Sequence, residues 1–116
     1  MNFIVGRLRK YLSEEDTFWV FTMIVESYLP FDYFAMMVGV LIDQKMFMKF
    51  VHYEFKKLHQ KFTSLGFDPS ILAFQWFVCI YTYNMPEKTS LQILDFFLLK
   101  GTKTLFSVGL ALVQIL

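Results

Sequence analysis

The chain has 116 residues, at most one domain, and its net charge of +1, with acidic and basic residues interspersed, excludes an electrostatic attraction to nucleic acid. Hydrophobic residues make up 56% of the chain and aromatic residues 20%, against an apolar share of roughly 45–50% in ordinary soluble domains. The excess of apolar residues requires burial in a membrane, against a permanent partner, or within a larger core.

The first thirty residues predict two helices. Residues 1 to about 11 carry apolar side chains at helical spacing and indicate the end of a helix. Ser13 followed by Asp16 resembles a capping box, so a second helix is expected over about 14–29, with acidic residues in its first turn. This second helix is apolar around most of its circumference, which predicts a central place in the core, and Pro30 ends it.

The middle of the chain predicts shorter helices. Residues 31–65 indicate two or three of them, with joints expected at Gly39 and at residues 43–45. From residue 47 to 65 the apolar side chains recur at helical spacing, which leaves one face for solvent. Gly66 is expected to cap the end of this region.

The remaining helices are predicted from their start signals. Asp68 and the proline after it combine a side-chain cap with a proline in the first turn, and predict a helix over about 69–83. Thr89 or Ser90 is expected to cap a helix over about 90–100, and Gly101 is expected to end it. Thr102 is expected to cap a last helix that runs to the chain end. No hairpin signal is present. The expected fold is therefore all-α, a multi-helix orthogonal bundle of six or seven helices.

No apolar stretch is long enough to span a bilayer, which takes about 20 residues. The uncharged candidates are residues 17–25, 69–86 and 104–116. The first and the last are short, and the middle one contains Gln75 and Asn84 between two prolines. We therefore expect no transmembrane span.

The few residue types able to carry chemistry do not assemble into a motif. On one straight helix His52 and His59 would lie about 10 Å apart along the axis, so they cannot share a metal ion without a bend and further ligands, and no metal site is expected. Cys79 is the only cysteine and is interpreted as a small buried apolar residue, compatible with a reducing compartment. Asp95 stands in an apolar run and is expected to be buried and tied to a neighbouring helix.

The whole chain resembles the C-terminal half of a TBC domain, the helical GTPase-activating domain that acts on Rab proteins. Six stretches carry the resemblance in matching order and spacing: MNFI (1–4), SEEDTFWVF (13–21), VESYLP (25–30), LIDQK (41–45), FQWF (74–77) and ILDFFLLKG (93–101). The family pattern usually has Trp at the position of Leu94. It often has Arg, a candidate partner for Asp95, at the position of Ser107.

The resemblance implies a GTPase activator rather than an enzyme in its own right, with a GTP-bound Rab-family GTPase as its partner in membrane traffic. The family inserts an arginine and a glutamine finger into the GTPase site, and an arginine finger accelerates GTP hydrolysis about 10³–10⁵-fold. The glutamine lies in a Tyr-x-Gln-Gly element immediately before the Met-Asn pair that corresponds to Met1 and Asn2, and the arginine lies further upstream. Residues 1–116 are therefore expected to be a partial TBC domain without both fingers, inactive alone.

No residue of the chain is expected to be catalytic, and no cofactor is expected. Asn2, next to the glutamine position, is the candidate for contact with the GTPase, while Arg7 and Arg9 are interpreted as ordinary surface arginines. The implied location is cytoplasmic, compatible with peripheral association with endomembranes through the partner. Two alternatives stay open: a non-catalytic GTPase-binding or regulatory fragment, and a small helical membrane protein.

Overall fold

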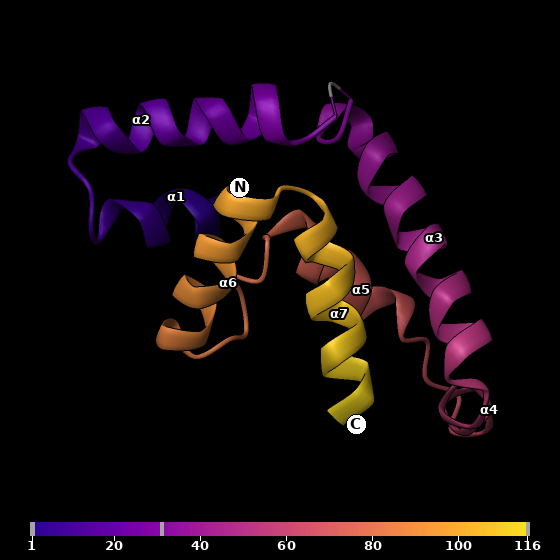
Figure 1. The fold of residues 1–116 in the computed structure, drawn as a ribbon. Helices are drawn as coiled ribbons and strands as arrows, with labels where there is room; N and C mark the ends of the chain where they lie inside the picture. The colour runs from indigo at the N-terminus through magenta and orange to yellow at the C-terminus, as the bar shows by residue number, and fades with distance from the viewer. Residues whose placement is uncertain (1, 31, 116) are drawn as a thin grey trace.

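The computed structural model describes residues 2–30 and 32–115. These residues contain seven α-helices and two short helical turns, joined by loops, and no strand occurs among them (Figure 1). The prediction of an all-α fold is confirmed. In chain order the elements are α1 (Asn2–Arg9), α2 (Glu14–Met23), the π-helical turn η1 (Ile24–Tyr28), the 3-10 turn η2 (Ala35–Met37), α3 (Val38–Glu54), α4 (Lys56–Ser64), α5 (Ser70–Val78), α6 (Glu87–Lys100) and α7 (Lys103–Ile115).

The α1–α2 pair forms an antiparallel hairpin along one side of the molecule (Figure 1). The Ser13 Oγ accepts a hydrogen bond from the Asp16 backbone N–H at 3.1 Å, which confirms the predicted cap of α2. The helix then widens into η1, where the Leu29 N–H donates to the Ile24 carbonyl oxygen at 3.0 Å, and leaves helical geometry at Leu29. The second helix therefore ends where the sequence predicts.

The predicted joints at Gly39 and at residues 43–45 are wrong, because α3 runs without interruption from Val38 to Glu54. Gly39 serves close packing instead of a break. A Cβ atom on it would lie 2.6 Å from the Tyr33 Cα, so only glycine allows the two backbone segments to approach this closely. The actual joint lies earlier, where Met36 and Met37 have φ of 51° and 58°.

The helix predicted over 69–83 is also shorter than expected, since α5 ends at Val78. The next residues leave the helix with φ of 47° at Ile80 and 58° at Tyr81, although both side chains are fully buried. The Tyr81 hydroxyl donates to the Leu105 carbonyl oxygen at 2.6 Å in the core. Burial and this hydrogen bond keep two residues in left-handed geometry that their side chains disfavour.

The helix predicted over about 90–100 begins three residues earlier than expected, at Glu87. Pro86 takes the cap position of α6, which begins at Glu87, and the Ser90 side chain is buried instead of capping. Two predicted helix ends are confirmed: Gly66 after α4 and Gly101 after α6 have positive φ of 68° and 77°, which glycine adopts without steric cost.

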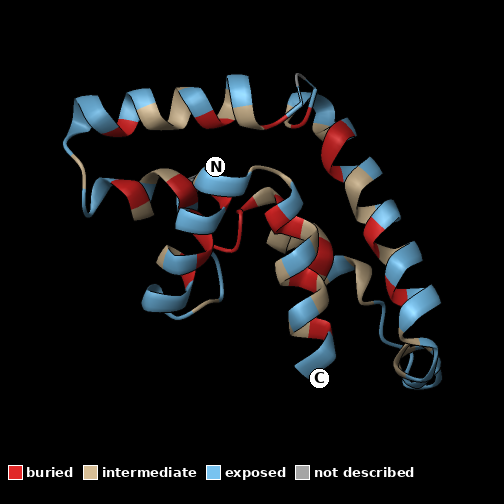
Figure 2. Cartoon of the chain, viewed as in Figure 1, coloured by how far each residue is buried: buried red, intermediate tan, exposed pale blue. Residues whose placement is uncertain are grey.

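The buried residues form one core cluster, to which α1 and α6 contribute together with α3, α5 and α7, and Figure 2 shows buried segments on these helices. Phe47 of α3 packs edge-on against Phe77 of α5, with ring centroids 5.4 Å apart. The Tyr33 hydroxyl donates to the Phe77 carbonyl oxygen at 3.0 Å and fixes the chain before α3 on this core. Gly109 of α7 lets the Phe47 ring approach, since a Cβ there would lie 2.7 Å from it.

The predicted central position of the helix over about 14–29 is wrong for its first part, α2, whereas Ile24 and Leu29 beyond it are buried in the core. Within α2 only Thr17 is buried, while Phe18 and Trp19 are each 60% exposed. Among the described helices α2 packs mainly against α1, so a hydrophobic circumference alone did not place it inside. The total accessible surface of 7661 Å² exceeds the roughly 6,600 Å² of a compact monomer of this mass.

Within residues 2–30 and 32–115, no helix combines the length and the apolar character needed to cross a bilayer.

Candidate functional site

A charged cluster joins the end of α1 to the start of α6. The Arg7 Nη2 donates to the Thr82 carbonyl oxygen at 3.2 Å, and its Nη1 lies 3.8 Å from the Glu87 Oε1. The Lys10 Nζ lies 3.3 Å from the same carboxylate oxygen, which also accepts a hydrogen bond from the Tyr11 hydroxyl. These contacts, led by the Tyr11 hydrogen bond and followed by that of Lys10, hold the pKa of Glu87 below its ordinary value.

The interpretation of Arg7 as an ordinary surface arginine is wrong, because its side chain is only 17% exposed and bridges α1 to the loop before α6. Arg9 does lie at the surface as predicted, and its Nη1 donates to the Leu12 carbonyl oxygen at 3.0 Å. Both guanidinium groups thus bind other groups of the chain. Arg7 connects α1 to the loop before α6 and to Glu87, and Arg9 binds the backbone just after the end of α1.

The start of α1 is where the sequence places the candidate GTPase contact. Asn2 opens the helix, but its side chain lies outside the described residues, so its role stays a prediction. Its neighbour Phe3 is half exposed and lies against Tyr83, with ring centroids 4.6 Å apart. This end of α1 therefore sits beside the loop between α5 and α6.

Two apolar surfaces are uncovered. The first, the α2 face, consists of Phe18, Trp19 and Met23, of which the last is 44% exposed. Beside it a cleft of about 400 Å³ opens between α1 and α2, where the Thr17 Oγ1 is buried without a hydrogen-bond partner. Exposed aromatic groups of this size on adjacent residues are typical of a surface that another polypeptide covers.

The second uncovered surface, the α3 stripe, consists of Ile42, Met46, Phe50 and Tyr53. Their spacings of four and three residues place them along one face of α3, and each is between 44% and 74% exposed. The opposite face of the same helix carries the buried Val40, Phe47 and Val51. The helix therefore separates the core from a second apolar surface.

Cys79 and Asp95 give opposite outcomes. Cys79 is buried as predicted, and desolvation raises the pKa of its thiol, so it is a packed apolar residue. The expected burial of Asp95 is wrong: it is exposed, because Ile93, Leu94 and Phe97 turn the buried face of α6 away from it. It borders a mostly apolar cleft of about 460 Å³ between α1, α2 and α6.

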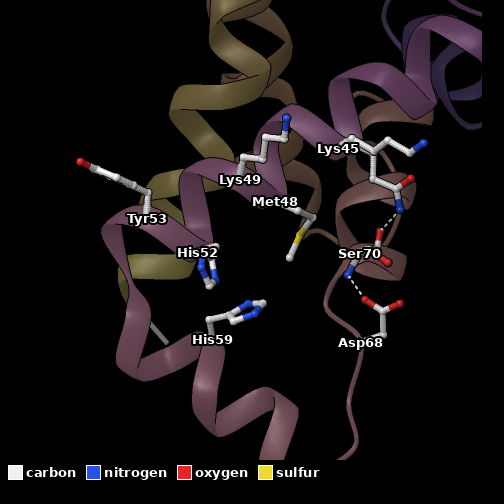
Figure 3. A pocket seen from close by; sticks show the side chains of 9 residues that line it. Lys45, Met48, Lys49, His52, Tyr53, His59, Asp68 and Ser70 are labelled. Carbon is white, nitrogen blue, oxygen red and sulfur yellow. Dashed lines mark hydrogen bonds between the residues drawn. The ribbon is translucent and has the colours of Figure 1, made fainter.

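A cleft with a volume of about 840 Å³ lies between α3, α4 and the start of α5 (Figure 3). The Gln44 Nε2 donates to the Ser70 carbonyl oxygen at 2.6 Å, and the Ser70 backbone N–H donates to the Asp68 Oδ1 at 2.9 Å. Hydrogen bonds from Ser70, its side chain first and its backbone second, hold the pKa of Asp68 below its ordinary value. This wall of the cleft is therefore fixed within the chain.

The opposite wall of this cleft carries both histidines. The helix breaks at Phe55 (φ −124°, ψ 53°), so the chain turns sharply into α4, and the rings of His52 and His59 meet edge to face with centroids 4.6 Å apart at 86°. The two histidines are therefore not on one straight helix, on which they would lie about 10 Å apart along the axis. No group of three or more His, Cys, Asp or Glu residues suited to a metal ion occurs in the described part of the chain.

The Rab-GTPase-TBC domain family matches residues 1–116, and the chain belongs to that family. Carabin of Mus musculus is 34% identical over 112 residues, which are 97% of this chain and 25% of Carabin. The putative GTPase-activating protein AN11010 of Emericella nidulans is 33% identical over 115 residues, 99% of this chain and 10% of that protein. The GTPase-activating protein gyp2 of Schizosaccharomyces pombe is 28% identical over 115 residues, 99% of this chain and 16% of that protein.

The chain thus spans a quarter or less of the length of these relatives. No solved structure matches it.

Proposed function

We propose that this chain forms part of a Rab GTPase-activating domain, which stimulates GTP hydrolysis by a GTP-bound Rab-type GTPase in membrane traffic. The observation that carries the proposal is the match of the TBC family over residues 1–116. Two of the similar proteins are themselves named as GTPase-activating proteins. The corresponding location is the cytoplasm, with peripheral association with endomembranes through the GTPase.

The chain would act as a partial TBC domain, completed by further helices of the same domain. The uncovered α2 face and α3 stripe support this, because both present large apolar side chains that a stable domain ordinarily buries. The surface is larger by roughly 1,000 Å² than that of a compact monomer, using the area scaling with mass. An obligate interface removes at least about 2,000 Å² from solvent, counted over both partners. The excess surface is therefore about the share that one partner contributes to such an interface.

The role of the described residues in such a domain is to position α1 beside the GTPase. Arg7 and Glu87 tie the end of α1 to α6, and Phe3 packs its beginning against Tyr83. A helix held at both ends keeps a contact residue at Asn2 in a fixed place, which is what a protein supplying groups in trans to a GTPase requires. Arg7 itself is held by Thr82 and Glu87, so we assign it a structural role.

A single-turnover GTPase assay tests the proposal. Rab proteins loaded with radiolabelled GTP are mixed with an excess of the 116-residue chain, or with a longer protein that contains it in a whole TBC domain. We expect the longer protein to accelerate hydrolysis at least a hundredfold with one Rab, and the chain alone to leave the intrinsic rate unchanged.

The second arm measures binding. Retention of the chain on GTP-loaded but not GDP-loaded Rab, without hydrolysis by the longer protein, would establish the non-catalytic alternative instead. In the longer protein, Asn2→Ala should lower kcat/KM about tenfold, the effect of losing one hydrogen bond made in the complex. Lys88→Ala, a change at an exposed position on α6, is the matched control.

A further inference from the structure

The cleft between α3 and α4 brings together two imidazoles and a thioether. Met48 and His52 lie four residues apart on α3, which places them on one face of the helix. His59 reaches the same cleft from α4 because the chain turns sharply at Phe55. Figure 3 shows the Met48 and His52 side chains extending into the cleft from α3 and the His59 side chain extending into it from α4. This arrangement is independent of the GTPase function.

We propose that His52, His59 and Met48 form a binding site for a copper(I) ion. A metal–nitrogen bond of about 2.0 Å, as imidazole ligands make, places a ring centroid about 3.2 Å from the metal. Two centroids that lie 4.6 Å apart then subtend an angle of roughly 90° at the metal. Small rotations about the broad histidine χ2 torsions open this angle to that of a three-coordinate ion.

One imidazole nitrogen in the cleft, the Nδ1 of His59, is buried and has no hydrogen-bond partner. A buried polar atom without a partner costs about 1–3 kcal/mol, and a metal bond satisfies a bare imidazole nitrogen. His52 is exposed, so an ion reaches the pair from solvent.

The other groups in the cleft select the metal. Lys45 and Lys49 line it, and the carboxylate of Asp68 is engaged by Ser70 on the far wall. Two lysines against the single carboxylate of Asp68, whose Oδ1 already accepts a hydrogen bond from Ser70, disfavour a divalent ion relative to a monovalent one. A thioether is a soft ligand that favours Cu(I), whereas zinc sites with structural roles take four nitrogen or thiolate ligands.

Competition with the Cu(I) chelator bicinchoninate under anaerobic conditions tests the site in the 116-residue chain. We expect the chain to withdraw one equivalent of Cu(I) from the chelator. His59→Gln and Met48→Leu should each weaken the affinity at least tenfold, with the far-UV circular dichroism unchanged. Met46→Leu, which alters an exposed methionine two residues away on α3, should leave the affinity unchanged.

Two further measurements separate this site from other copper ligands. The chain contains seven methionines, and with ¹³C-labelled methionine methyl groups only the signal that disappears in Met48→Leu should shift when Cu(I) is added. Cys79→Ala should retain the affinity. The proposal is overturned if no copper is withdrawn, if Met48→Leu binds as tightly as the parent, if the Cys79→Ala chain loses the ion, or if Zn²⁺ binds more tightly than Cu(I).

Discussion

Gly39 provides the sharpest test of how the segment before α3 is packed. In Gly39→Ala the new Cβ would meet the Tyr33 Cα at 2.6 Å, the Tyr33 N at 3.1 Å and the Asp32 carbonyl oxygen at 3.3 Å. All three are backbone atoms, so relief requires the chain to move. Overpacking of this kind costs about 1–3 kcal/mol, and the better helix propensity of alanine returns up to about 1 kcal/mol. Because the close atoms are backbone, the cost lies in the upper part of that range, about 2–3 kcal/mol, and the expected net loss is about 1–2 kcal/mol.

Gly6 is the matched control for this substitution. It also lies within a helix, but a Cβ on it meets nothing within 4 Å. Gly6→Ala should therefore stabilise the chain by about 0.5–1 kcal/mol through helix propensity alone. The two substitutions make the same chemical change with opposite expected signs.

Urea unfolding and amide hydrogen exchange measure the difference. With a urea m-value of about 1–2 kcal/mol per molar for a chain of this size, Gly39→Ala should lower the midpoint by roughly 1 M. Exchange should accelerate first at the Gly39 and Val40 amides, which donate to the Asp32 and Tyr33 carbonyl oxygens at 3.2 and 3.3 Å. An unchanged or raised midpoint in Gly39→Ala would refute the close backbone approach.

Four further predictions concern the core, its pH dependence and the uncovered surface. Tyr81→Phe removes the hydrogen bond to the buried Leu105 carbonyl and should cost about 1–2 kcal/mol by urea unfolding. Burial raises the pKa of Tyr33 and of Tyr81, so the stability they contribute is present below the unfolded tyrosine pKa of about 10 and falls at higher pH. Absorbance at 295 nm should show both ionising only as the chain unfolds. The pKa of Glu87 is lowered, so Glu87→Gln should destabilise slightly at pH 7, and its difference from the parent in thermal unfolding should vanish as the pH falls below about 4. Trp19→Ser should reduce dye binding and self-association while changing stability by less than about 0.5 kcal/mol.

The tyrosine and Glu87 predictions each have a control at an exposed position. Tyr53→Phe, at 74% exposure, should leave the urea midpoint and the alkaline behaviour unchanged. Lys88→Gln removes a charge next to Glu87 in sequence without touching the cluster at the end of α1, and should show no difference that depends on acid pH. Dye binding by Trp19→Ser equal to that of the parent would mean that the dye does not bind at the α2 face.

The helix ends with strong local signals could be predicted, and the helix interiors could not. Ser13, Gly66 and Gly101 act through their own side chain or their own φ, so the sequence pattern suffices for them. Gly39 looks like a helix breaker for the same local reason. Its role comes from Tyr33, whose backbone it meets only after folding.

The cleft that holds the two histidines could be predicted only in part, because its geometry depends on the bend between α3 and α4. The two histidines are visible in the sequence, but their separation follows from whether the chain continues as a helix through Phe55. No proline or glycine marks that bend, so the sequence indicates that a bend would bring the histidines together but not that one occurs at Phe55. The role of Asn2 rests on the family resemblance and stays a prediction.

The sequence by itself determined the helical class, the capped ends of several helices and the membership of the TBC family, because these depend on periodicity, single capping residues and the order of short motifs. The tertiary structure decided which apolar faces are covered: it left Phe18 and Trp19 in solvent and forced Ile80 and Tyr81 into left-handed geometry. The physical reason is that burial is a property of what lies opposite a side chain. Periodicity shows that a face is apolar, but only the packed neighbours show whether it is filled.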